Sequence, residues 1–304
     1  MLTLSTLSGT SETDFATSVQ KQVENGVQVR TYVPDSRYSA TSFEAIRELF
    51  AEVWSFRSHI AAMFGAEFRN SYRGTVFGVF WNFALPLVPL SVYILLVNLR
   101  VFPVYDGLNP AIYISFNVTI WSLLTGLITR PIIVVKSRNT ESTRTAQPIS
   151  VAILASFARL CFDTLVGLAL LCILIVVFSQ WPKTNLLMLI PILLSAMVLC
   201  FSLGLMLAIF NVIIPDVERV VTIVLQYGVF VSGVIFPLGG LGPLKVLEPF
   251  NPFNVYIQAL RDDVFFGHVS NHTAVWSWAG IAILLFLISM RFFYVMERRI
   301  RGIS

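Results

Sequence analysis

The fold class of this chain is decided by the stretch Ser71–Val97, SYRGTVFGVFWNFALPLVPLSVYILLV. Its first residues, as far as Arg73, are polar or basic. From Gly78 onward about twenty residues are almost all apolar. A helix rises about 1.5 Å per residue, so a run of this length can cross the hydrocarbon core of a bilayer. We therefore expect the chain to enter a membrane at this point.

The composition excludes an ordinary soluble domain. Of the 304 residues, 56% are hydrophobic and 12% are charged, whereas roughly a quarter of the residues in soluble domains are charged. The net charge of +4 could indicate a nucleic-acid partner, but the basic residues flank apolar runs, so membrane topology explains them better. The three cysteines lie inside apolar runs, which indicates neither a disulfide framework nor a metal site. We expect no cleaved signal peptide, because the first residues lack a basic flank and an apolar core.

Apolar segments recur along the rest of the chain at spanning length, the fifth being the shortest. The six segments are Phe77–Leu99, Ala111–Val135, Ser156–Phe178, Leu186–Phe210, Thr222–Pro237 and Val275–Tyr294. Basic residues gather before the first segment, between the second and third, and after the sixth. The positive-inside rule then places both termini in the cytoplasm. The expected fold is an all-α membrane protein with six transmembrane helices.

The segment before the first crossing predicts an amphipathic helix. A capping-box pattern at Thr41 and Glu44 starts it, and apolar residues such as Phe43 and Phe50 recur at helical spacing. Such a helix can lie in the cytoplasmic interface of the membrane or pack against a soluble domain. We divide the chain into a mobile polar tail at 1–42, with a short strand at Gly26–Val33, the interface helix at 43–72, and the transmembrane domain at 73–304.

The connection Gly239–Asn271 between the fifth and sixth segments is too long for a turn and too apolar for a solvated loop. We expect two short helices here, broken between Pro249 and Pro252. They form either external re-entrant helices or an external cap. Non-helical backbone at membrane depth requires cover by protein or a water-filled path.

The sequence offers little for catalysis. GxSxG, HExxH and CxxC are absent, as is a phosphate-binding GxxxxGK[ST] loop, so ATP hydrolysis would require another chain. Asp262 and Asp263 are either a site for a metal and a phosphate headgroup or ordinary acids on a solvated helix. Asp163, with Arg159 one turn earlier, is either a proton relay or a structural ion pair.

Aromatic residues are the remaining candidates for contact with a substrate. They make up 13% of the chain, and their rings can stack on the C–H faces of sugars. Helix packing and lipid contact are the alternative for each residue. The candidates for lining a transport path are Phe80, Tyr93, Tyr113, Phe116, Trp121, Tyr227, Phe230 and Phe236.

Three motifs, in order, give the chain a resemblance to the membrane subunits of ABC-2 type exporters, in particular the permeases for O-antigen, teichoic acid or capsule. The motifs are Tyr72-Arg73 with Phe77-Gly78, Trp81 and Pro86; Asn211 with Pro215-Asp216; and Asn251-Pro252 with Arg261-Asp262. The resemblance covers about Phe43 to Ser304. Pro215 stands where the family has an arginine, so the role of that arginine does not transfer.

The resemblance implies a homodimer in the bacterial inner membrane that moves a lipid-linked glycan, with two copies of a separate ATPase that binds ATP and Mg. This chain itself would hold no cofactor or metal. The interface helix would act as a gate, and the gate and headgroup entrance would comprise Arg69, Tyr72, Arg73, Gly78 and Trp81. The ATPase-coupling loop would include Lys136, Arg138, Asn139 and Arg144, and the external re-entrant region Asn251, Pro252, Arg261 and Asp262. The alternatives are a permease for a smaller lipid or drug, a membrane-embedded glycan-modifying enzyme, and a scaffold.

Overall fold

The computed structural model describes residues 21–24, 27–30, 41–72, 107–141, 148–238, 245–246 and 248–302, with 80, 84, 88, 91–92, 95–96 and 99. Strands β1 (Lys21–Glu24) and β2 (Val27–Arg30) form an antiparallel hairpin in which Lys21 pairs with Arg30. Strand β2 lies within the predicted strand Gly26–Val33. Outside this hairpin, the regular structure of the described residues is helical, as expected.

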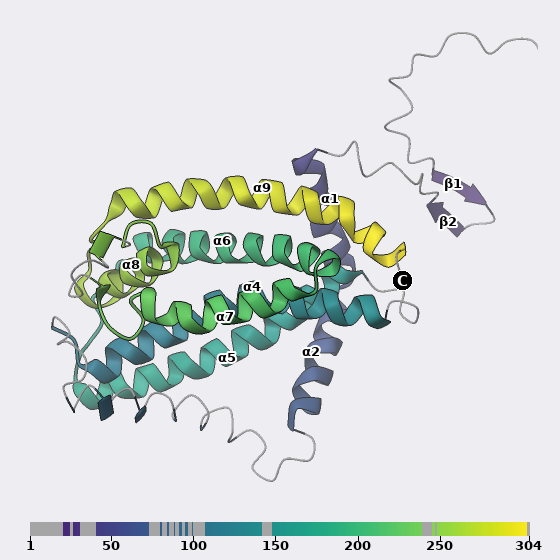
Figure 1. Ribbon diagram of the computed structural model, residues 1–304. Helices are drawn as coiled ribbons and strands as arrows, with labels where there is room; N and C mark the ends of the chain where they lie inside the picture. The colour runs from purple at the N-terminus through teal and green to yellow at the C-terminus, as the bar shows by residue number, and fades with distance from the viewer. Residues whose placement is uncertain are drawn as a thin grey trace, which may run out of the picture.

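Four long helices form a bundle (Figure 1): α4 (Pro110–Glu141), α5 (Ile149–Phe178), α6 (Leu186–Ile213) and α9 (His272–Gly302). Helix α6 contacts both α4 and α9, and α4 also contacts α5. Within the described ranges, these four helices are long and apolar enough to cross a membrane. They coincide with the second, third, fourth and sixth predicted segments. The first segment, Phe77–Leu99, lies outside the described residues except for isolated positions.

Helices α4 and α6 approach each other closely at Gly204. A Cβ atom at this position would lie 2.5 Å from the carbonyl oxygen of Leu127 and 2.9 Å from the Cα of Ile128. Such distances are too short for any side chain, so only glycine allows the two backbones to meet here. The contact fixes the centre of the bundle, where Leu205, Ala208 and Ile209 are fully buried.

The fifth predicted segment forms a shorter helix than expected. Helix α7 spans Asp216–Val231, and at 1.5 Å per residue it is about 24 Å long, below the roughly 30 Å of a hydrocarbon core. From Ser232 the chain leaves the helix, and Gly233 takes a positive φ of 66°. The expected continuation to Pro237 is therefore a turn, with Val234 and Ile235 buried in it.

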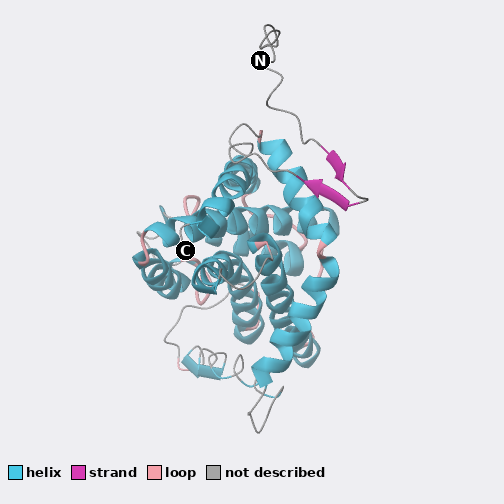
Figure 2. Ribbon diagram, turned by 90° about the vertical axis from the view of Figure 1, so that its right-hand side faces the viewer, coloured by secondary structure: helices cyan, strands magenta, loops and turns pink. Residues whose placement is uncertain are grey.

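The interface segment is two helices, α1 (Ser42–Ser55) and α2 (Arg57–Tyr72), where one continuous helix was expected. The Ser55 hydroxyl donates to the Glu52 carbonyl at 2.7 Å and competes with the backbone for this acceptor. The predicted capping box at Thr41 and Glu44 is confirmed, with bonds of 2.8 and 3.3 Å. Both helices lie across one end of the bundle, and Figure 2 views the molecule from that side.

The connection before α9 contains one helix where two were expected, in the part that the structure describes. Helix α8 (Pro252–Phe266) begins at Asn251, whose side chain accepts from the amides of Phe253 and Asn254. Before it, the described residues form a single turn at Lys245–Val246 and a further turn ending at Phe250. Helix α8 contacts α4, α6 and α9. It lies at the bundle end opposite α1 (Figure 1), and we call the two ends the α1 end and the α8 end.

Candidate functional site

Helix α1 combines an anchored face with an apolar outer face. Ala45 and Leu49 are buried where α1 meets α9 and α5. Phe43 and Trp54 are 77% and 71% exposed, and the guanidinium of Arg57 lies 5.3 Å from the centre of the Trp54 indole. Exposed aromatic residues beside a basic residue suit a helix that lies in a membrane interface.

Two carboxyl groups converge on the first turn of α5. The backbone N–H of Ile149 donates to Oε1 of Glu297 at 2.9 Å, and the Ser150 hydroxyl donates to Oε2 of Glu52 at 3.0 Å. Glu297 is completely buried. The first amides of a helix have no partner within it, so a carboxyl oxygen there is a natural acceptor. This carboxyl clasp of Glu52, Ile149, Ser150 and Glu297 joins α1, α5 and α9.

A second polar contact at the α1 end joins α4 to α7. The ammonium of Lys136 lies 2.5 Å from Oε2 of Glu218, and the Glu218 amide donates to the Asn211 side chain at 2.9 Å. A cavity of about 510 Å³ beside this pair is lined by Lys136, Pro215, Asp216, Glu218, Arg219, Thr222 and Ile223. Lys136, a residue of the predicted coupling loop, lies near the C-terminal end of α4. The side chains of Arg138 and Asn139, and all of Arg144, lie outside the described residues.

The predicted entrance cannot be assembled from the described residues. The side chains of Arg69 and Tyr72 are outside them, as are Arg73, Gly78 and Trp81 and the path candidate Tyr93. An apolar pocket of about 140 Å³ does open at this end between α1, α5, α6 and α9.

The aromatic candidates divide into buried and exposed groups. Tyr113 is 3% exposed, and Phe116 and Trp121 are also buried in α4. Their rings pack within the chain: Phe116 lies 5.6 Å from Phe265, and Trp121 lies 5.1 Å from Phe253. For these three residues the packing alternative describes the single chain better than contact with a substrate.

The exposed aromatic candidates can still line a transport path. Tyr227 is 63% exposed, and Phe230 and Phe80 are exposed as well, whereas Phe236 is half-buried. Tyr227 and Phe230 stand three residues apart on α7 and therefore share one face. Only these two exposed candidates are brought together by the described structure.

The irregular segment after α7 is held by Tyr113, which was predicted to line a path, and by Asn117, which sequence reasoning missed. The Tyr113 hydroxyl donates to the Gly233 carbonyl at 3.0 Å, and the Asn117 amide donates to the carbonyls of Gly233 and Val234 at 3.2 and 3.0 Å. These bonds satisfy backbone groups that no helix can satisfy, as a buried non-helical segment requires. A lone asparagine in an apolar segment was the available signal.

The acids of α8 are buried, so of the two alternatives for Asp262 and Asp263 the one of acids on a solvated helix is wrong. The Arg261 guanidinium donates to Asp262 at 3.2 Å and lies 4.5 Å from the centre of the Tyr113 ring. Ser270 donates to the other oxygen of Asp262. Asp263 is fully buried, and burial raises the pKa of its carboxyl group. The acids are buried because α8 packs against α4 and α6, a contact that the local sequence does not reveal.

Asp163 is held by two arginines. Nε of Arg159 donates to one carboxyl oxygen at 2.9 Å, and Arg130 of α4 approaches the other at 3.4 Å. This geometry favours the structural ion pair over the proton relay, because both oxygens are engaged. Among the described residues no group of three or more histidine, cysteine or acidic residues could hold a metal.

Comparison with known proteins agrees with this architecture. The family model of the ABC-2 type transporter matches residues 58–265, more than half of the chain. The chain is also similar to the O-antigen export system permease protein RfbA of Myxococcus xanthus, with 24% identity over 231 residues, which cover 72% of this chain and 85% of that protein. The chain therefore belongs to the ABC-2 type transporter family.

Proposed function

We propose that this protein is the membrane-spanning permease subunit of an ATP-driven exporter that moves a lipid-linked polysaccharide from the cytoplasm across the inner membrane. The similarity to an O-antigen export permease over most of the chain carries this proposal. Two copies of this chain would enclose the path, and two copies of a separate ATPase would bind ATP and Mg. Both termini would be cytoplasmic, which makes the α1 end the cytoplasmic side and the α8 end the exit side.

The contacts at the α1 end support a mechanical role for the interface helices. The carboxyl clasp connects α1 to the first turn of α5 through Ser150 and Glu52, and α5 begins directly after the predicted coupling loop. A displacement of that loop by the ATPase would thus act on α1 through one short polar contact. Helix α1 is then in a position to open or close a route for a headgroup at the membrane surface.

A permease for a smaller lipid is the second candidate. It is favoured by the burial of Tyr113, Phe116 and Trp121, which leaves fewer aromatic side chains for a sugar path than the sequence offers. A narrower path for a smaller lipid needs fewer exposed aromatic side chains.

Reconstitution of this chain with the separate ATPase distinguishes the two candidate functions. The complex is placed in lipid nanodiscs, and ATP turnover is measured with a lipid-linked glycan or with a phospholipid of the same acyl chains. We expect stimulation by the lipid-linked glycan alone. Equal stimulation by both would favour the smaller lipid, and failure of the chain to bind the ATPase would refute the exporter proposal.

A further inference from the structure

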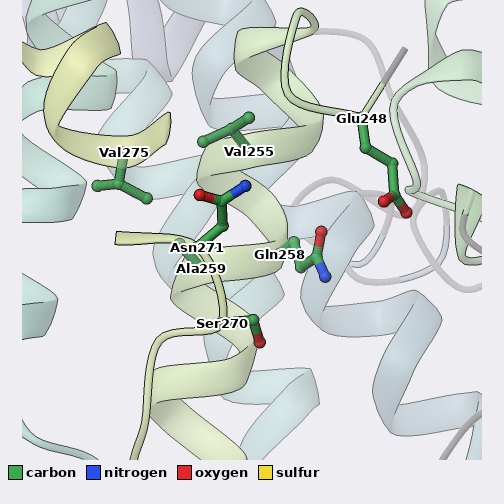
Figure 3. A pocket seen from close by; sticks show the side chains of 7 residues that line it. All are labelled: Glu248, Val255, Gln258, Ala259, Ser270, Asn271 and Val275. Atoms are coloured by element: carbon green, nitrogen blue, oxygen red, sulfur yellow. The ribbon is translucent and has the colours of Figure 1, made fainter. Parts of the chain in front are cut away.

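A small pocket at the α8 end lies between α8 and the start of α9 (Figure 3). Its volume is about 220 Å³. Helix α8 contributes Val255, Gln258 and Ala259, whose spacing of three and four residues places them on one face. Asn271 and Val275 contribute the opposite wall, and Glu248 and Ser270 complete the lining.

The pocket has an apolar floor and a polar rim. Val255, Ala259 and Val275 are buried and present only hydrocarbon. The rim consists of a carboxylate, two amides and a hydroxyl, from Glu248, Gln258, Asn271 and Ser270. This combination of apolar surface with a few convergent polar groups is typical of small-molecule sites.

Two of the rim groups are available to a ligand as far as the described residues are concerned. Within the described part of the chain, the Glu248 carboxylate and the Gln258 amide form no hydrogen bond or ion pair. Figure 3 shows these two side chains turned toward each other. Asn271 uses its oxygen to accept from the Ala274 amide at 3.1 Å, which leaves its nitrogen as a donor. Ser270 already donates to Asp262 and retains acceptor capacity.

The rim is fixed by contacts outside the pocket. The Glu248 amide donates to the Lys245 carbonyl at 3.1 Å, and the Glu248 carbonyl accepts from the Asn254 side chain at 3.3 Å. The Trp278 indole donates to the Pro249 carbonyl at 3.0 Å. A site whose backbone is held in this way loses little freedom when it binds a ligand.

We propose that this pocket binds a single neutral or amino-sugar ring of the exported glycan at the exit side of the permease. The apolar floor fits the C–H face of a sugar, and the rim supplies acceptors and donors for its hydroxyl groups. The volume is below the roughly 300–1,000 Å³ of pockets for larger ligands, so it holds one ring and not an oligosaccharide. Acidic sugars are disfavoured, because the Glu248 carboxylate would face a second negative charge.

A cation site fits these residues less well. A calcium ion takes six to eight oxygen ligands, whereas the pocket offers one free carboxylate, and the nearby Asp262 is already engaged by Arg261 and Ser270. The inference that the bound sugar belongs to the exported glycan rests on the proposed function. Binding of the sugar itself depends only on the pocket.

The test uses the purified full-length permease in lipid nanodiscs, without its ATPase. Saturation-transfer NMR measures binding of three sugars: N-acetylglucosamine, glucosamine and glucuronate. We expect transfer to the first two sugars and a signal for glucuronate weaker by about fivefold. Gln258→Ala should lower the transfer to N-acetylglucosamine by about fivefold, because one neutral hydrogen bond is lost. Glu248→Gln, which keeps the shape of the side chain, should raise the glucuronate signal to that of N-acetylglucosamine.

Thr273→Ala is the matched control, since Thr273 is exposed near the start of α9 but does not line the pocket. It should leave all three signals unchanged. The pocket proposal is overturned by absence of transfer to N-acetylglucosamine, by equal signals for glucuronate and N-acetylglucosamine in the unsubstituted protein, or by unchanged transfer in correctly folded Gln258→Ala. If the lipid-linked glycan still stimulates the ATPase in that case, only the sugar site falls and the exporter proposal stands.

Discussion

Replacing Gly204 with alanine should destabilise the bundle, although alanine is the better helix former. The new Cβ would lie 2.5 Å from the Leu127 carbonyl oxygen and 2.9 Å from the Ile128 Cα. Both atoms belong to the backbone of α4, so no side-chain rotation relieves the overlap. Overpacking of this kind costs about 1–3 kcal/mol, whereas the change from glycine to alanine in a helix gains roughly 0.5–1 kcal/mol. The central values of the two effects, about 2 and about 0.75 kcal/mol, give a net loss of about 1 kcal/mol.

Gly280→Ala supplies the control in α9. In the part of the chain that the structure describes, a Cβ at Gly280 would meet no atom of a neighbouring element within 4 Å. This variant should therefore gain helix propensity without a steric overlap. Both variants are unfolded by sodium dodecyl sulfate in mixed micelles, and tryptophan fluorescence reports the free energy of unfolding. We expect Gly204→Ala to be less stable than the unsubstituted protein and Gly280→Ala to be at least as stable. A Gly204→Ala protein with unchanged or increased stability would refute the close approach of α4 and α6.

Three further outcomes concern the α1 end. Glu297→Leu should cost about 1–3 kcal/mol of unfolding free energy in the same assay, because it leaves a backbone amide of α5 buried without an acceptor; Glu297→Gln, which keeps an oxygen, should recover most of the loss. Lys136→Glu should lower ATP turnover of the complex with its ATPase, because it replaces the ion pair with two like charges. The double variant Lys136→Glu with Glu218→Lys should restore part of the turnover, because it re-forms the pair with the charges exchanged. The pKa of Glu44 is lowered because its carboxylate accepts a hydrogen bond from the backbone N–H of Thr41. The cap therefore contributes its full stabilisation of α1 at pH values above the ordinary glutamate pKa. This stabilisation is lost as the pH falls through the lowered pKa of the folded protein. The protection of the α1 amides against hydrogen exchange, measured relative to the intrinsic exchange rate at each pH, should therefore fall in acid. Thr41→Ala should weaken the cap by about 1 kcal/mol at neutral pH.

The long helices were predictable because their signal is local. A run of apolar residues long enough to span a bilayer indicates by itself that the segment lies in a membrane. Helices α4, α5, α6 and α9 lie where the sequence predicted such segments. The capping box at Thr41 is likewise complete within four residues. Such features depend on neighbours in the sequence and not on distant contacts.

The polar groups inside the bundle were harder to interpret, because their partners are distant in the sequence. Glu297 lies beside the basic residues at the end of α9, so the sequence suggests that it is part of a charged tail. In the structure it accepts a hydrogen bond from the backbone N–H of Ile149, 148 positions earlier. Asp262 and Asp263 read as solvated acids until α8 is known to pack on the bundle. The break between α1 and α2 involves neither proline nor glycine; the Ser55 hydroxyl contact with the Glu52 carbonyl accompanies it.

The two ends of the bundle use polar groups in different ways, and this difference bears on how the molecule could move. At the α1 end, side chains join separate helices through single contacts, as in Ser150 with Glu52 and Lys136 with Glu218. At the α8 end, Tyr113 and Asn117 hold backbone carbonyls of the irregular segment through several bonds. A single polar contact that stays partly exposed is worth about 1 kcal/mol or less, so the contacts of Ser150 with Glu52 and of Lys136 with Glu218 can be exchanged at little cost. Release of the buried carbonyls, like release of the buried bond between Ile149 and Glu297, would cost the desolvation of each group. In the proposed exporter, motion driven by the ATPase would then reposition α1 and the helix ends around it, while the α8 end keeps its shape.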